Sequence, residues 1–217
     1  MYITANGIKI YYEVYGCGKP VILLHGNGEN CKRFCTLAKK LMKDYKVFAP
    51  DSRCHGKSED TDKISYSLMA EDTARFISAL KIEKPALYGF SDGGIIGLSV
   101  AANHPEILSK LIISGVNLNP EALNKDFLNR VNAEYEKTKD KRLKMILDEP
   151  HITESDLKKI TAPVAVLAGE KDIVKKEHTV YIASRIKRGT YKIFSGETHS
   201  GYVDNGKIYP VLKEFLN

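Results

Sequence analysis

The stretch Pro85-Ala-Leu-Tyr88-Gly89-Phe90-Ser91-Asp92-Gly93-Gly94 decides the fold expected for this chain of 217 residues. Its first four residues are an apolar run that predicts a strand, and the small and aliphatic residues 95–102 that follow predict a helix. Gly-x-Ser-x-Gly between a strand and a helix is a sharp turn, in which glycines let the two backbones pass closely. A serine between glycines is common in ordinary loops, but this context predicts that Ser91 stands clear of a sheet.

Apolar runs of strand length alternate with segments of helical period along most of the chain. The predicted strands are residues 8–15, which look like an outer antiparallel strand, and 20–24, 46–50, 85–88, 110–114, 163–168 and 191–194. The predicted helices are residues 31–43, 67–80, 94–103, 177–186 and 208–216. This alternation is typical of an α/β fold, in which helices cover both faces of a mostly parallel sheet.

Residues 117–161 interrupt the alternation. This segment is highly charged, but Leu123, Phe127, Val131 and Tyr135 follow one another at steps of four residues, which predicts an amphipathic helix. We find no internal repeat, low-complexity tract or linker that would indicate a second domain. We therefore expect a single domain, 1–217, with a helical cap inserted at approximately 117–161.

Composition argues against several classes of protein. The 33 basic residues stand against 27 acidic ones and are scattered, whereas a nucleic-acid-binding protein concentrates its charge in a patch or stripe. No apolar run approaches the roughly 20 residues that cross a bilayer, and residues 1–16 lack the features of a secretory signal. The four cysteines show no zinc-binding spacing. We expect a cytoplasmic protein with reduced thiols and neither a nucleic-acid nor a membrane partner.

Two residues further along the chain fit the chemistry of a serine nucleophile. A serine hydroxyl needs a histidine to accept its proton and a carboxylate to orient that histidine. Asp172 follows the predicted strand 163–168, and His199 follows the predicted strand 191–194, so the three residues occur in the order Ser, Asp, His. Glu170 and Asp204 are competing acids, but Asp172 is preferred.

A negatively charged intermediate needs backbone donors near the serine. The N–H of Asp92 opens the helix after Ser91, where N–H groups are free and the helix dipole is positive. The second donor is expected in His25-Gly26-Asn27-Gly28, which follows the predicted strand 20–24, and it is assigned to the N–H of Asn27. His25 precedes the serine in the chain and is expected to brace this loop rather than to transfer protons.

The motifs together resemble those of the α/β-hydrolase superfamily, and in particular its esterase-like and lipase-like serine hydrolases with a small cap. The matching stretches are His25-Gly-Asn-Gly28, Asp51-Ser-Arg-Cys-His-Gly-Lys-Ser58, Gly89-Phe-Ser-Asp-Gly-Gly94, Gly169-Glu-Lys-Asp172 and Thr198-His199. The resemblance implies an eight-stranded, mostly parallel sheet, a Ser-His-Asp triad, an oxyanion hole of two backbone amides, and neither a metal nor an organic cofactor. It also implies bracing roles for Arg53 and His55, while Cys54 departs from the glycine that is usual there.

Ser91 stands where similar dehalogenases and epoxide hydrolases carry an aspartate, which favours acyl transfer through an ester intermediate. The leading expectation is hydrolysis of small carboxylic esters. Thioesters, lactones, amides, carbon–carbon bonds and transfer to another acceptor stay open, because a fold and a triad do not fix the substrate. A proline aminopeptidase that uses Glu134 or Glu136 ranks lower. A non-catalytic small-molecule receptor on the same fold is the alternative of a different class, although the intact triad argues against it.

The substrate pocket is expected to be modest and open, because the predicted cap is short. By analogy with the fold, Phe90, Leu118, Phe127 and Ile173 are expected near its mouth, although apolar residues at such positions are as often part of a core. The oligomeric state and the natural substrate are not determined by the sequence.

Overall fold

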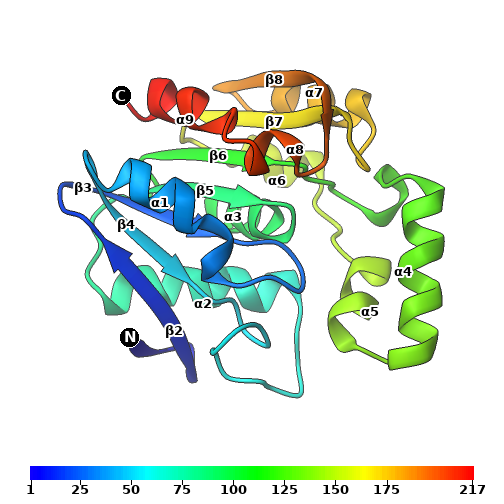
Figure 1. The fold of residues 1–217 in the computed structure, drawn as a ribbon, viewed down its shortest axis with the longest axis horizontal. Helices are drawn as coiled ribbons and strands as arrows, with labels where there is room; N and C mark the ends of the chain where they lie inside the picture. The colour runs from blue at the N-terminus through cyan, green and yellow to red at the C-terminus, as the bar shows by residue number, and fades with distance from the viewer.

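A computed structural model describes residues 1–217 and is built around an eight-stranded sheet with the order β1-β2-β4-β3-β5-β6-β7-β8 (Figure 1). The strands are β1 (Tyr2–Ala5), β2 (Ile8–Tyr15), β3 (Lys19–Leu24), β4 (Tyr45–Pro50), β5 (Ala86–Phe90), β6 (Lys110–Ser114), β7 (Val164–Lys171) and β8 (Gly189–Thr198). The pairs β1–β2 and β2–β4 are antiparallel, and all other neighbouring strands run parallel. The expected eight-stranded, mostly parallel α/β sheet is confirmed.

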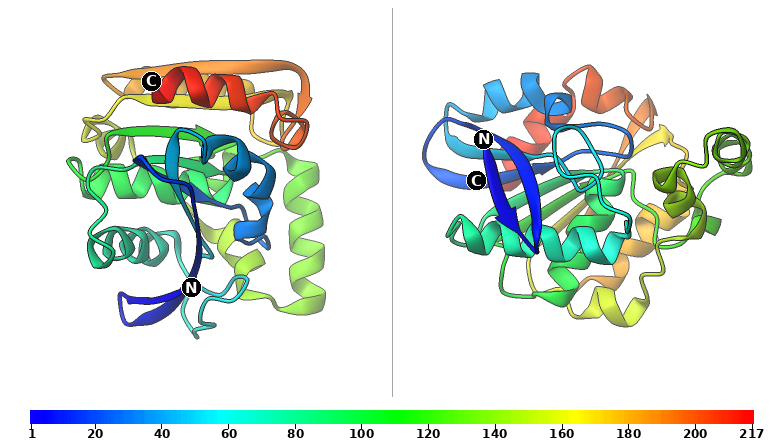
Figure 2. Two further views of the ribbon diagram at one scale, coloured as in Figure 1. Left: turned by 60° about the vertical axis from the view of Figure 1, so that its left-hand side comes forward. Right: turned by 90° about the horizontal axis from the view of Figure 1, so that it is seen from below.

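Helices cover both faces of this sheet, as the right-hand view of Figure 2 shows. They are η1 (Cys31–Phe34), α1 (Cys35–Leu41), α2 (Tyr66–Ala79), α3 (Asp92–Asn103), η2 (Pro120–Ala122), α4 (Lys125–Thr138), α5 (Lys141–Asp148), α6 (Glu154–Lys158), α7 (Lys176–Arg185), α8 (Gly201–Asp204) and α9 (Ile208–Leu216). Because successive strand side chains point to opposite faces, β3 contributes to two separate cores. Ile22 and Leu24 pack in the core beneath α2 and α3, whereas Val21 and Leu23 pack in the core beneath α1 and α9.

The cap helices, a name that we use for α4 and α5, stand beyond the carboxyl ends of the parallel strands (Figure 1). They have a small apolar cluster of their own, in which Val131 of α4 packs with Ile146 of α5. Each helix has a polar cap at its start: Asn124 accepts the N–H of Phe127, and Asp140 accepts the N–H of Arg142. Helix α6 packs instead on α3 and α7 of the layer that covers the sheet.

Strand β1 and the start of the first cap helix differ from the sequence-based expectations. Strand β1 was not predicted; it pairs with β2 through a tight turn at Asn6-Gly7, where both residues have positive φ. In the cap segment, the helix starts at Lys125, so Leu123 precedes it and pairs with Val174 in an isolated bridge. No helix of the structure combines the length and the apolar character that a bilayer crossing requires.

Candidate active site

Ser91 occupies a strained turn between β5 and α3. Its φ of 53° and ψ of −119° lie in a region that residues other than glycine rarely adopt. Its N–H donates to the carbonyl of Ser114 on β6 at 2.8 Å. The turn requires glycine at two flanking positions: a Cβ on Gly89 would overlap the carbonyl of Gly93, and a Cβ on Gly93 would overlap the carbonyl of Leu24. The backbone therefore holds the Ser91 hydroxyl at the carboxyl edge of the sheet.

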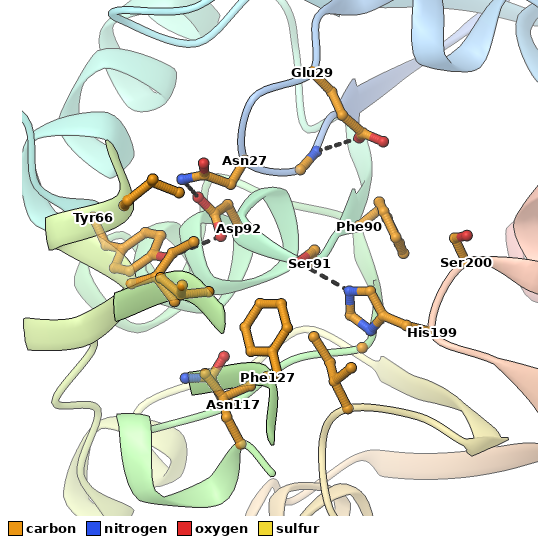
Figure 3. A pocket seen from close by; sticks show the side chains of 17 residues that line it. Asn27, Glu29, Tyr66, Phe90, Ser91, Asp92, Asn117, Phe127, His199 and Ser200 are labelled. Atoms are coloured by element: carbon orange, nitrogen blue, oxygen red, sulfur yellow. Dashed lines mark hydrogen bonds between the residues drawn. The ribbon is translucent and has the colours of Figure 1, made fainter. Parts of the chain in front are cut away.

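His199 bridges Ser91 and Asp172. Its Nε2 lies 3.1 Å from the Ser91 Oγ, a contact drawn in Figure 3, and its Nδ1 lies 2.6 Å from the Asp172 Oδ1. The Asp172 side chain is 1% exposed and also accepts the N–H groups of Gly169 and Val174. With the proton held on Nδ1 by the carboxylate, Nε2 is the nitrogen that can accept the proton of the serine.

The competing acids lie elsewhere. Glu170 accepts the hydroxyl of Ser195 and the N–H of Gly196, and backbone donation from Gly196 lowers its pKa. Asp204 pairs with Arg33 and accepts the Ser200 hydroxyl. Neither carboxylate contacts His199, so Asp172 is the acid that the fold brings to the histidine.

Gly115, which the sequence analysis did not single out, makes room for the histidine. It follows β6 with a φ of +62°, and a Cβ there would lie 2.5 Å from the Cε1 and 2.7 Å from the Nδ1 of His199. Real contacts are rarely shorter than about 3.4 Å, so a side chain at this position displaces the imidazole. A glycine directly after a central parallel strand was the available signal.

The loop after β3 lies against Ser91. A Cβ on Gly26 would lie 3.2 Å from the Ser91 Cβ, so glycine allows the close approach. The His25 ring fixes the loop: its Nδ1 donates to the Gly26 carbonyl at 2.8 Å, and its Nε2 accepts the Ser52 N–H at 3.0 Å. Burial, with a smaller contribution from His55, lowers the pKa of His25 to about 4, so the ring is neutral at neutral pH and makes both hydrogen bonds.

Arg53 and His55 have structural contacts. Arg53 pairs with Asp72 through two hydrogen bonds of 2.5 and 2.6 Å, and both side chains are buried. The Nδ1 of His55 bonds to the carbonyl of Arg53 at 2.8 Å. Neither residue contacts Ser91 or His199. Their contacts are those of residues that hold the loop 51–58 onto α2.

A cavity of about 400 Å³ opens beside Ser91 and His199, between the sheet edge and the cap helices (Figure 3). Phe90, Phe127 and Ile173 line it, as expected. Leu118 does not, which corrects the expectation: its side chain is 3% exposed within the core, and its N–H donates to the Nε2 of His178 at 2.9 Å. The lining residues not anticipated from the sequence include Glu29, Tyr66, Asn117, Leu143, Ile146 and Ser200.

A family model described as the alpha/beta hydrolase fold matches residues 19–153. The chain belongs to the α/β-hydrolase fold family. The match takes in the loop 25–28, the Ser91 turn and the cap helices, while the order of the eight strands and the Ser-Asp-His order agree with the family pattern described above. The protein is a hydrolase-family member, as the sequence motifs predicted.

Curated relatives match about half of this α/β-hydrolase. Serine hydrolase BPHL of Homo sapiens is 34% identical over 125 residues, which are 53% of this chain and 42% of that protein. The sn-1-specific diacylglycerol lipase ABHD11 of Danio rerio is 29% identical over 119 residues, which are 52% of this chain and 38% of that protein. The matched region thus spans less than half the length of either relative.

Solved structures match over the full length. The esterase EaEST from Exiguobacterium antarcticum superimposes with a TM-score of 0.87 at 26% identity, covering 99% of this chain and 98% of that one. A meta-cleavage product hydrolase from Pseudomonas fluorescens IP01 superimposes with a TM-score of 0.84 at 19% identity, covering 100% of this chain and 97% of that one. At that identity, the second likeness concerns the fold alone.

Proposed function

We propose that this α/β-hydrolase is a serine carboxylesterase that cleaves small, uncharged carboxylic esters through an acyl-enzyme formed on Ser91. The observation that carries the proposal is the hydrogen-bonded chain from the Ser91 Oγ through His199 to the buried Asp172, which opens onto a cavity. The full-length likeness to an esterase supports the choice of ester substrates.

In the first half of the reaction, the Ser91 Oγ attacks the ester carbonyl carbon while the Nε2 of His199 takes its proton. The imidazolium is stabilised by the Asp172 carboxylate, which contacts Nδ1 at 2.6 Å. The carbonyl oxygen becomes an oxyanion that accepts the backbone N–H groups of Asn27 and Asp92. The tetrahedral intermediate then collapses, its bond to the alcohol oxygen breaks, and the alcohol leaves with the proton from Nε2.

In the second half, water replaces the alcohol. His199 removes a proton from water, and the resulting hydroxide attacks the acyl carbon of the Ser91 ester. A second tetrahedral intermediate forms with its oxyanion at the same two N–H groups. Its collapse breaks the bond to the Ser91 Oγ, which regains the proton from Nε2, and the carboxylic acid is released.

The cavity limits the size and charge of the substrate. Its volume of about 400 Å³ accommodates a small ligand, and its cap side is apolar, with Phe127, Val131 and Leu143. Glu29 and Asp92 contribute carboxyl groups, whereas no lysine or arginine lines the cavity. A substrate carboxylate would lose hydration there without gaining a cationic partner. Esters with an uncharged acyl chain are therefore favoured over monoesters of dicarboxylic acids.

The test is hydrolysis of p-nitrophenyl esters with acyl chains of two to twelve carbons, together with p-nitrophenyl hemisuccinate as an anionic substrate. The wild type is expected to hydrolyse the short neutral esters with the highest kcat/KM and the hemisuccinate at least about tenfold more slowly. Ser91→Ala, His199→Ala and Asp172→Asn are expected to lose kcat, with the smallest loss for Asp172→Asn.

Three results would redirect the proposal. Equal activity of the wild type and Ser91→Ala would exclude an acyl-enzyme formed on Ser91. Reaction of Ser91 with a fluorophosphonate, without turnover of any ester in the series, would favour an amide, a carbon–carbon bond or a different acyl acceptor. A wild type that neither reacts nor turns over would favour a non-catalytic receptor.

A further inference from the structure

The side chain of Asp92 is buried directly behind the nucleophile. Asp92 is 4% exposed, opens helix α3 and has no cationic partner. Its Oδ1 accepts the hydroxyl of Tyr66 at 2.9 Å, and its Oδ2 accepts the side-chain amide of Asn27 at 2.9 Å, as Figure 3 shows. Burial raises the pKa of this carboxyl, and the two donors act against that rise. Because both oxygens accept, the contacts match the ionised form.

Asn27 joins three parts of the molecule. Its side-chain Nδ2 donates to Asp92 at 2.9 Å and to the carbonyl of Arg142 in cap helix α5 at 3.2 Å. The Asn27 backbone belongs to the loop after β3, which lies against Ser91. The same two residues whose backbone N–H groups are assigned to the oxyanion are thus linked through their side chains. Burying a carboxyl costs free energy, and packing alone does not require one here.

We propose that the side chains of Asn27 and Asp92 form a brace that fixes the spacing of their own backbone N–H groups, and that the Arg142 carbonyl extends this brace to the cap. Both are positioning residues through their side chains. This inference rests on the proposed function, because it assumes that the two N–H groups bind an oxyanion. The His25 ring holds the Gly26 carbonyl, which belongs to the same peptide as the Asn27 N–H, and the side-chain bond from Asn27 to Asp92 is the contact that ties this peptide to the start of α3.

A brace of this kind acts on the transition state. The carbonyl oxygen of a bound ester is a weak acceptor, whereas the tetrahedral oxyanion depends on both N–H groups. Loosening one donor therefore lowers kcat and leaves KM almost unchanged. Removing an oxyanion donor outright costs about 10²- to 10³-fold in kcat, so misplacing one is expected to cost about 10- to 100-fold.

The test compares Asp92→Asn with Asp92→Leu, which have similar size, and adds Asn27→Ala. Asparagine at position 92 still offers an oxygen to the Asn27 amide, whereas leucine offers none. We expect Asp92→Asn to retain kcat within about threefold, and Asp92→Leu and Asn27→Ala each to lose about 10- to 100-fold with KM changed less than about threefold. The double variant Asn27→Ala, Asp92→Leu is expected to lose no more than the worse single variant, because the two residues act as one unit.

A second readout separates positioning from packing. A trifluoromethyl ketone with the preferred acyl chain forms an oxyanion when Ser91 adds to its carbonyl. The secondary alcohol with the same chain has no carbonyl and forms none. The ketone is expected to bind the Asn27→Ala protein more weakly by the same factor as the loss of kcat/KM, and the alcohol equally well. Asn27 is half-buried, so this variant carries the test if Asp92→Leu does not fold.

The brace is overturned if the folded Asn27→Ala and Asp92→Leu proteins retain wild-type kcat, or if their losses multiply in the double variant. Loss of affinity for the alcohol and the ketone alike would show a packing role instead. These results differ from failure of the proposed function, in which Ser91→Ala would retain ester hydrolysis.

Discussion

Gly115→Ala is expected to reduce catalysis through one methyl group. The new Cβ would lie 2.5 Å from the Cε1 and 2.7 Å from the Nδ1 of His199. Carbon atoms pack at about 3.5–4.0 Å, so the ring must shift by roughly 1 Å. The ring cannot move freely, because Asp172 and Ser91 hold its two nitrogens. A displacement of about 1 Å in a reacting group costs about 100-fold, and we expect kcat to fall by that factor.

The same substitution also strains the backbone, because Gly115 has a φ of +62°. An L-residue in this region costs about 1–2 kcal/mol, which for a chain of this size lowers the Tm by roughly 2–8 °C. Gly196→Ala is the matched control: its φ is +74°, but a Cβ there meets nothing within 4 Å. It is expected to show a similar loss of Tm with wild-type kcat.

The assay is the steady-state hydrolysis of the best short p-nitrophenyl ester, at a temperature where thermal unfolding shows each variant to be folded. Wild-type kcat in Gly115→Ala would show that the imidazole tolerates the methyl group and that its position does not depend on this glycine. An equal loss of kcat in Gly115→Ala and Gly196→Ala would show that backbone strain alone explains the effect.

Three further perturbations follow from contacts in the structure. Asp72→Asn leaves Arg53 buried without its ion pair and is expected to lower the free energy of unfolding by about 3–5 kcal/mol in urea titrations. Glu71→Gln, at a half-buried carboxylate that pairs with the exposed Arg75, is expected to lower it by less than about 1 kcal/mol. The pKa of His25 is lowered to about 4, so the folded state binds fewer protons than the unfolded state between pH 6.5 and 4. The stability that His25 contributes above pH 6.5 should be lost as the pH falls through this window, by about 1.4 kcal/mol per pH unit. Urea titrations at a series of pH values should show that the free energy of unfolding of His25→Gln changes less with pH than that of the wild type. Phe127→Ala enlarges the cap side of the cavity and is expected to move the optimum of the p-nitrophenyl series to longer acyl chains; an unchanged optimum would place the acyl group elsewhere.

The sequence predicted the strands that the core buries most completely. The runs that became β3 and β6 were identified within one residue, because their apolar side chains pack on both faces of the sheet. Strand β1 was missed because only one of its four residues is buried, although the turn Asn6-Gly7 was a signal for a hairpin. The predicted strand 191–194 is shorter than β8, because most residues of β8 are partly or fully exposed and show no clear pattern of apolar side chains.

The residues of the proposed triad were easier to place from the sequence than the cavity around them. Ser91, Asp172 and His199 each follow a strand, and parallel strands bring their carboxyl ends to one edge, so order and spacing suffice to bring them together. Which apolar side chains face the cavity depends on how the chain turns after the strand. Leu118 turns into the core, whereas Tyr66, from a distant segment, reaches the Asp92 carboxyl. No local pattern in the sequence encodes either outcome.

Covalent labelling tests whether Ser91 is the nucleophile. The wild type and Ser91→Ala are incubated with a fluorophosphonate, digested and mapped by mass spectrometry. We expect one phosphonylated peptide in the wild type, modified at Ser91, slower labelling in His199→Ala, and no labelling in Ser91→Ala. Labelling of Ser91→Ala at another residue, at the rate of the wild type, would mean that Ser91 is not the nucleophile.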